Sequence, residues 1–103
     1  MVNLDPARGH EQAGSRPALV ISVDLFNHGP ADLVVICPIT KQAKGIPFHV
    51  EVSPPEGGLS YKSFVKCEDV RSVSTERLIK RVGAVLPKNM EAVADRLRII
   101  IGL

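Results

Sequence analysis

The sequence contains very few aromatic side chains. Four of its 103 residues are Phe or Tyr, and Trp is absent. The hydrophobic core must therefore consist of Val, Ile and Leu, and the β-branched members of this group favour strands. No apolar run approaches the roughly 20 residues that a membrane-spanning helix needs. The first residues also lack the basic start and apolar stretch of a signal peptide. We therefore expect a cytoplasmic protein that makes no contact with a membrane.

Cysteine and net charge are also low. The two cysteines, Cys37 and Cys67, lie in separate apolar stretches, whereas small secreted scaffolds usually carry more. We interpret both as buried free thiols. No cluster of His, Cys and Asp has the spacing of metal ligands, so neither a metal nor another cofactor is predicted. The formal net charge of +2 permits nucleic-acid binding without requiring it.

Short apolar segments separated by turn residues dominate the chain. The β-branched runs predict buried strands at residues 18–23 and 33–37, the second ended by Pro38. Residues 48–52 alternate apolar and polar, which predicts a half-buried strand with His49 and Glu51 facing outward. Further short strands are predicted at residues 2–4, 63–67 and 70–73. Residues 53–60 hold two prolines and two glycines and predict a mobile turn.

One helix is predicted at the C-terminal end. Met90, Val93, Leu97 and Ile101 recur at helical spacing, and Gly102 is a suitable stop. Five or more short strands followed by one helix indicate a mainly β fold, either a small barrel or a strongly bent sheet with a helical cover. We see no linker or internal repeat, so residues 1–103 are interpreted as a single domain.

Three segments resemble one known family when they are taken in order. Residues 5–17 read DPARGHEQAGSRP, residues 37–40 read CPIT, and residues 68–73 read EDVRSV. This series is similar to the motifs of the MazF/PemK-type toxins of type II toxin–antitoxin systems. The resemblance implies an SH3-like small barrel, a homodimer, sequence-specific cleavage of single-stranded RNA and inhibition by a cognate antitoxin. The third motif of the family commonly reads Asp-Gln where this chain has Glu68 and Asp69, a difference that bears on base preference.

Cleavage of RNA without a metal uses the 2′-OH as the nucleophile and leaves a 2′,3′-cyclic phosphate. Such a site needs a proton acceptor, a cation or donors for the phosphate, and a proton donor for the leaving oxygen. Arg16 is the predicted cation, because its planar guanidinium matches phosphate oxygens. Thr40 is predicted to donate its hydroxyl to the phosphate. Glu11 is the candidate base or the group that orients Arg16, and the proton-transfer role is left open.

Substrate binding is predicted for a second group of polar residues. Lysines in a loop position the phosphate backbone, whereas carboxylates and amides bond the edges of unstacked bases. We interpret His10 as a solvated loop residue and assign no role to His28 or His49. The predicted substrate-binding residues are Gln12, Ser15, Lys41, Gln42, Lys44, Glu68 and Asp69. A solvated loop without contact to the RNA is the open alternative for Lys41, Gln42 and Lys44.

Two alternatives to an RNA-cleaving toxin are kept open. One is a non-catalytic toxin of the same fold, on the pattern of the CcdB toxin that poisons DNA gyrase. The other is a degenerate member that only binds antitoxin. A pure binder has no need of Arg16, Thr40 and Glu11 together, so these residues favour the enzyme. The antitoxin is expected to dock an acidic segment that folds on binding.

Overall fold

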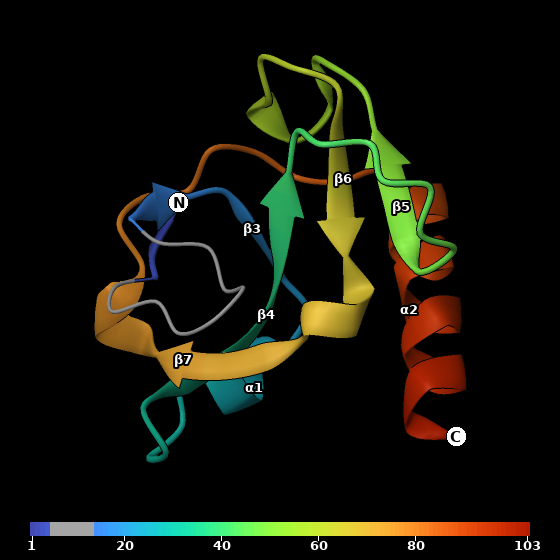
Figure 1. Ribbon diagram of the computed structural model, residues 1–103. Coiled ribbons are helices and arrows are strands. Elements are labelled where there is room, and N and C mark those ends of the chain that lie inside the picture. The colour runs from blue at the N-terminus through green and yellow to red at the C-terminus, as the bar shows by residue number, and fades with distance from the viewer. Residues whose placement is uncertain (5–13) are drawn as a thin grey trace.

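The computed structural model describes residues 1–4 and 14–103 (Figure 1). Two sheets are present in this part of the chain, one of two strands and one of five. The strands are β1 Val2–Asn3, β2 Ser15–Arg16, β3 Ala18–Val20, β4 Leu33–Thr40, β5 His49–Val52, β6 Ser63–Lys66 and β7 Arg71–Ser74. The α-helices are α1 Asp24–Asn27 and α2 Pro87–Ile101, and the 3-10 helices are η1 Glu56–Gly58, η2 Cys67–Asp69 and η3 Thr75–Arg77. The expected mainly β fold with a C-terminal helix is confirmed.

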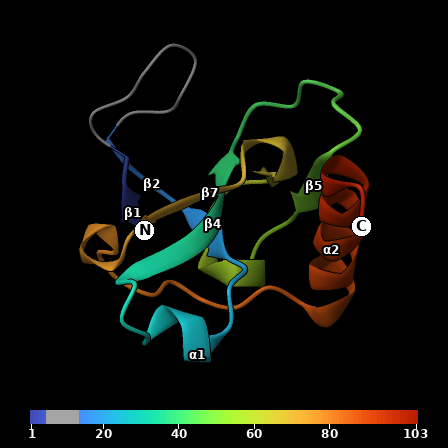
Figure 2. The same cartoon turned by 90° about the horizontal axis from the view of Figure 1, so that it is seen from below.

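The long strand β4 organises the five-stranded sheet. It pairs with β7 through Leu33 to Ile36 and with β6 through Ile39 and Thr40, while β3 pairs with Ile36 to Pro38. All these pairs are antiparallel, and β5 continues the sheet beyond β6. The change of partner along β4 bends the sheet into a small barrel-like arrangement, which Figures 1 and 2 show from two sides.

The prediction that Pro38 ends its strand is wrong, because β4 runs on to Thr40. Ile39 donates its N–H to the Pro17 carbonyl at 3.1 Å, on the β3 side. Backbone groups alternate between the two edges of a strand, so the nitrogen of Pro38 faces the other edge. There the pairing with β7 stops at Ile36 and the pairing with β6 starts at Ile39. Proline fits inside the strand because, among the described residues, no strand pairs with it on that edge.

A second difference concerns the predicted strand at residues 18–23. β3 stops at Val20, and Val23 is the residue before α1, a short helix that the sequence pattern did not predict. Ser22 supports this change of direction, since its hydroxyl accepts the Val35 N–H at 2.9 Å and donates to the Asn27 side chain. These side-chain hydrogen bonds stabilise the turn by which the chain leaves the sheet after β3.

Two separate groups of buried side chains form the core. The larger group lies between the β4–β6–β5 part of the sheet and α2, and it consists of Cys37, Ile39, Val50, Val52, Val65, Cys67 and Val93. The smaller group lies behind β1 and consists of Val2, Leu4, Val34 and Ile36. As expected, α2 presents Val93 and Leu97 to the larger core and ends at Gly102, whose φ of 83° is left-handed.

The two cysteines are free and fully buried, as predicted. Both belong to the larger core group. A hydrogen bond between the two thiols, together with burial, raises the pKa of Cys37, and the same hydrogen bond lowers the pKa of Cys67. No helix in residues 1–4 and 14–103 has the length and apolar character needed to cross a membrane.

Candidate active site

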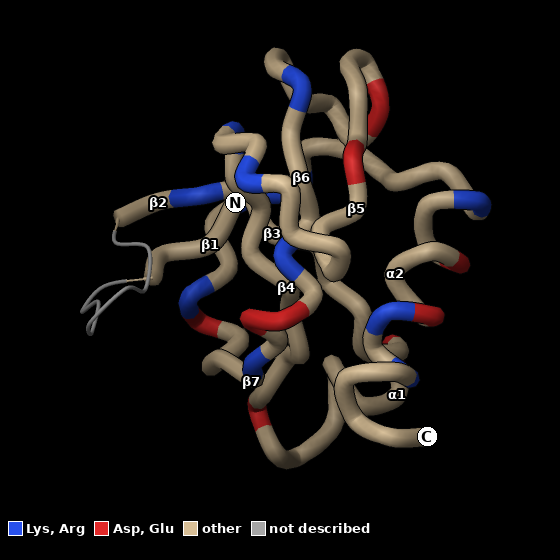
Figure 3. Tube along the Cα trace, turned by 45° about the vertical axis from the view of Figure 1, so that its right-hand side comes forward, with Lys and Arg blue, Asp and Glu red and all other residues tan. Residues whose placement is uncertain are grey.

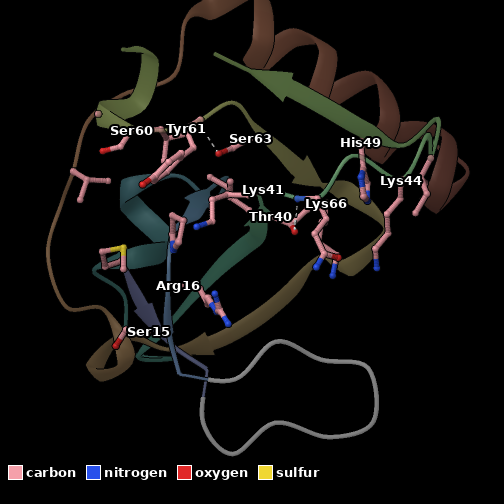
Figure 4. A pocket seen from close by; sticks show the side chains of 18 of the residues that line it. Ser15, Arg16, Thr40, Lys41, Lys44, His49, Ser60, Tyr61, Ser63 and Lys66 are labelled. Atoms are coloured by element: carbon pink, nitrogen blue, oxygen red, sulfur yellow. Dashed lines mark hydrogen bonds between the residues drawn. The ribbon is translucent and has the colours of Figure 1, made fainter. Parts of the chain in front are cut away.

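A cavity of about 620 Å³ lies beside the end of β4 (Figure 4). Its described lining comes from β2, from the end of β4 and the segment after it, from the start of β5, from the loop before β6, and from β6 and η2. Met1 and Val82 complete it. Arg16, Lys41, Lys44 and Lys66 are basic, whereas Glu68 is the only carboxylate among the described lining residues. Figure 3 shows basic segments gathered between β2 and β6. An excess of positive charge in a recess attracts an anionic ligand such as a phosphate chain.

Arg16 occupies the edge of this cavity at the end of β2. Its backbone pairs with Val2, which is 1% exposed and inserts into the smaller core group. The next residue, Pro17, accepts the N–H of Ile39, and Ile39 directly precedes Thr40. One backbone hydrogen bond thus links the residue after Arg16 to the residue before Thr40. The structure brings these two predicted residues to the same cavity.

Thr40 is the last residue of β4 and is 8% exposed. Its Oγ1 accepts the backbone N–H of Gln42 at 3.2 Å. A hydroxyl that accepts one bond still carries its own proton, which it can donate to a phosphate oxygen. Lys41, Gln42 and Lys44 follow and join Ser15 in the lining. Their role in substrate binding stays a prediction.

His49 also lines the cavity, and its predicted outward orientation is wrong. Its side chain is 3% exposed, and its Nε2 lies 2.8 Å from Oε2 of Glu68. The predicted alternation is confirmed at Glu51, which is exposed, between the buried Val50 and Val52. Glu68 in the 3-10 helix η2 contacts His49. Within the described residues, Nδ1 of this histidine is buried without a hydrogen-bond partner.

Glu68 and Asp69 are adjacent in the sequence but have different surroundings. Glu68 lines the cavity and is 32% exposed at its side chain, so it is the more accessible member of its pair with His49. Asp69 is outside the described lining. Its Oδ2 lies 2.9 Å from the Arg71 guanidinium and 3.5 Å from Nζ of Lys66, and Lys66 does line the cavity. Asp69 therefore positions a cationic side chain of the site.

Glu11 and Gln12, the remaining predicted site residues, lie outside the described residues. Within the described ranges, no group of three or more His, Cys, Asp or Glu side chains is arranged to hold a metal ion. The cavity instead offers a guanidinium, a buried hydroxyl and a histidine–carboxylate pair. His49 is the functional candidate that the sequence pattern missed. The sequence offers one indication of its importance: Glu68, the hydrogen-bond partner of His49, belongs to the third motif.

Residues 1–101 match the model of a family described as the PemK-like, MazF-like toxin of type II toxin–antitoxin systems. The chain belongs to this family. The resemblance of the three motifs to MazF/PemK-type toxins is thereby confirmed. The match extends over nearly the whole chain, so the cavity between β2, β4 and β5 is part of the family's domain.

Known MazF proteins are similar in sequence and in structure. "Endoribonuclease MazF9" of Mycobacterium tuberculosis is 35% identical to this chain, with 99% of this chain and 91% of that protein covered. The crystal structure of MazF from Deinococcus radiodurans matches with a TM-score of 0.83 and 34% identity, over 99% of this chain and 90% of that one. A MazE–MazF structure from the same organism matches with a TM-score of 0.75 and 29% identity, over 85% of this chain and 83% of that one.

Proposed function

We propose that this protein is a toxin endoribonuclease that cuts single-stranded RNA at a specific sequence, with the 2′-OH of the RNA as the nucleophile. The products are a 2′,3′-cyclic phosphate and a 5′-OH, and the loss of mRNA inhibits translation and growth. The observation that carries the proposal is the joint presence of Arg16 and Thr40 at one cavity. Family membership supports it, since the relative from Mycobacterium tuberculosis is named an endoribonuclease.

Arg16 acts on the charge of the phosphate in this proposal. A guanidinium is always protonated and can donate two parallel hydrogen bonds to phosphate oxygens. Negative charge builds up on those oxygens as the 2′-oxygen attacks phosphorus, so a fixed cation stabilises the transition state more than the ground state. Thr40 adds a neutral donor from a rigid position, because its strand contributes buried side chains to both core groups.

Proton transfer has two candidates. Glu11 is the one predicted from the sequence motif. The pair of Glu68 and His49 is the one that the cavity adds, with the carboxylate toward the substrate and the imidazole behind it. Nε2 of His49 lies within hydrogen-bond distance of the Glu68 carboxylate, so a proton can pass between the two groups. Replacing Glu11 by Gln and His49 by Asn, in separate variants, distinguishes the two, because loss of a general acid or base lowers the rate by about 10²–10⁴.

The proposal includes partners. The basic cavity suits an acidic antitoxin segment, and a cognate antitoxin is consistent with the MazE–MazF structure from Deinococcus radiodurans. A homodimer is also proposed, and light scattering checks it by measuring a mass near twice 11.1 kDa. Because the target is cellular RNA, the site of action is the cytoplasm.

Incubation with a long single-stranded RNA in excess chelator tests the proposed function. Mapped ends should show one recurring sequence, a cyclic phosphate on one side of each cut and a free 5′-OH on the other. Arg16→Ala should lower the cleavage rate by about 10²–10³, the usual loss when one transition-state donor is removed. Lys62→Ala is the matched control, since Lys62 is outside the described cavity lining and its Nζ lies 3.4 Å from Glu51.

One result would contradict the proposed activity, and a second would contradict the proposed mechanism. The first is absence of cleavage by the native protein. If the protein still binds antitoxin, that result favours the degenerate toxin, and inhibition of gyrase would favour the CcdB-like alternative. The second is undiminished cleavage by Arg16→Ala, which would remove this residue from the mechanism and leave the endonuclease activity standing.

A further inference from the structure

The cavity contains one aromatic side chain that the proposed chemistry does not use. Tyr61 is the only Phe, Tyr or Trp side chain of the described lining. It is 64% exposed, whereas Phe48 packs against the larger core and Phe64 lies 6.4 Å from the His49 ring. The chain has few aromatic rings, and the exposed position of Tyr61 gives up the apolar contacts that this ring could make in the core. Its place on the wall of the cationic cavity suggests a ligand.

Lys41 contacts this ring. Its Nζ lies 4.6 Å from the ring centroid of Tyr61, within the range of a cation–π interaction. Lys41 directly follows Thr40, so the ring is connected through one residue to the hydroxyl of the proposed site. Figure 4 shows Tyr61 and Lys41 on one side of Thr40, with His49, Lys44 and Lys66 on the other. The cavity is therefore longer than the space for a single phosphate.

The backbone that presents Tyr61 is fastened to the rest of the molecule. Oε2 of Glu56 accepts the Leu86 N–H at 2.8 Å and lies at the same distance from Nδ2 of Asn89. Gly57 donates its N–H to the Ala84 carbonyl at 3.1 Å. The Tyr61 carbonyl itself accepts the Ser63 hydroxyl at 2.8 Å. The ring is thus exposed on a loop that is held at several points, which is the arrangement of a preorganised binding surface.

We propose that Tyr61 is a base-stacking platform for the RNA. A nucleobase next to the scissile phosphate stacks on the face of the ring that Lys41 leaves open, and Lys41 contacts the phosphate that follows. Recognition of single-stranded RNA commonly combines aromatic stacking with cations along the backbone. This inference rests on the proposed function, because it assigns part of the RNA to one end of the same cavity.

The composition of the chain provides a direct readout of stacking. Because the sequence has one Tyr and no Trp, its intrinsic fluorescence arises from Tyr61 alone. The probe is a short RNA of the mapped cleavage sequence, with 2′-deoxyribose at the nucleotide that supplies the attacking oxygen, so that it binds without being cut. Stacking should quench the fluorescence of Tyr61. The quenching should reach its plateau at the same concentration as the fluorescence anisotropy of a labelled copy of the RNA. Free tyrosine amide corrects for light absorbed by the RNA.

A series of abasic RNAs then locates the stacked base. Removal of one particular base should abolish the quenching and weaken binding, while removal of the others should leave the quenching in place. Tyr61→Ala should weaken binding of the intact RNA by about 5- to 150-fold, the range for loss of one stacked base. Tyr61→Ala and the native protein should have equal affinities for the abasic RNA that lacks the stacked base. The KM of this variant for cleavage should rise while kcat stays close to the native value.

Matched variants separate stacking from other effects. Tyr61→Phe keeps the ring and should bind RNA nearly as well as the native protein, although its fluorescence is lost. Lys62→Ala should leave both the quenching and the binding unchanged. Thermal unfolding followed by circular dichroism checks that Tyr61→Ala folds, as expected for a side chain that is 64% exposed.

The inference is overturned if RNA binds without quenching, or if Tyr61→Ala weakens every abasic RNA equally. It is also overturned if an acidic antitoxin peptide quenches the fluorescence and RNA does not. If the native protein cuts no RNA, the proposed function fails separately. The titration then uses homopolymer oligonucleotides, and quenching by one of them supports the platform on its own.

Discussion

Arg16 and Thr40 reach the same cavity from parts of the fold that are supported very differently. Arg16 belongs to β2, a two-residue strand with both side chains exposed, and its pairing strand β1 is equally short. Thr40 ends an eight-residue strand that pairs with three others. The smaller core lies behind Arg16 and the larger core lies behind Thr40. Local damage to one core should therefore affect one of these residues more than the other.

The difference shows where the site depends on few contacts. The position of Arg16 depends on Val2 and Leu4, which are 1% and 3% exposed, and on the hydrogen bond from Ile39 to Pro17. The position of Thr40 is fixed by the pairing of β4 with β3, β6 and β7. A fixed charge must lie within a fraction of an ångström of its target to be effective. β1 therefore supports the active site by positioning Arg16, although it contains no catalytic group.

The largest expected effect concerns the loop on the Thr40 side. A Cβ at Gly58, whose φ is +69°, would overlap the Val82 carbonyl oxygen. Gly58→Ala should lower the free energy of unfolding by about 2–5 kcal/mol, from left-handed strain and overpacking together. Gly45→Ala is the matched control, since Gly45 also has a positive φ but a Cβ there would meet nothing within 4 Å. It should cost only about 1–2 kcal/mol, as measured by urea unfolding.

Equal losses in the two glycine variants would contradict the close approach of Gly58 to Val82. In that case the loop that carries Tyr61 is not held against the segment around residue 82. The part of the cavity next to Thr40 would then be less firmly supported than we infer.

The next effect concerns the Arg16 side. Val2→Ala and Val34→Ala remove the same atoms from the same core group, and both side chains are 1% exposed. Each should cost about 1–3 kcal/mol of stability. Only Val2 pairs with Arg16, so Val2→Ala should lower the RNA cleavage rate at least about tenfold through displacement of the guanidinium. Val34→Ala should keep most of the rate, measured in single turnover below both unfolding transitions.

Parallel losses of cleavage in the two valine variants would mean that activity follows overall stability. The special dependence of Arg16 on β1 would then be refuted. The same interpretation applies if Val2→Ala loses stability as expected but cleaves RNA at the native rate.

The smallest effect concerns Asp69. Asp69→Asn weakens the carboxylate contacts with Lys66 and Arg71, whose side chains are 16% and 20% exposed. The cleavage rate should fall about two- to fivefold, the usual scale for a partly exposed ion pair, and to the same extent for every RNA sequence. Sequencing of the cut ends checks this expectation. A changed cleavage sequence would instead support base recognition by Asp69, as the family resemblance predicts.

Much of the fold could be predicted because it depends on local sequence patterns. The β-branched run at residues 33–37 and the helical spacing from Met90 to Ile101 both gave elements close to those observed. Strand ends were less predictable. The continuation of β4 through Pro38 depends on which edge of the strand lacks a partner at that point, and that information lies in β6 and β7.

The candidate site divides in the same way. Arg16 and Thr40 could be named as candidates because they belong to compact motifs, and both line the cavity. His49 was missed because its burial depends on its contact with Glu68 in η2, which follows much later in the chain. Tyr61 was missed because the loop before it is held by contacts of Glu56 and Gly57 with residues 84–89. The expectation of a mobile turn at residues 53–60 missed the hydrogen bonds of Glu56 and Gly57 for the same reason. Long-range contacts, which no local pattern encodes, determine each of these positions.

The most direct test is a double-mutant cycle on the rate of RNA cleavage. Single-turnover rates in excess chelator are measured for the native protein, Arg16→Ala, Thr40→Val and the double variant. If both side chains act on one phosphate, each should depend on the other, and the double variant should lose much less than the product of the two single losses. Losses that multiply in full, or a native rate in either single variant, would contradict the claim that the two sides of the cavity form one active site.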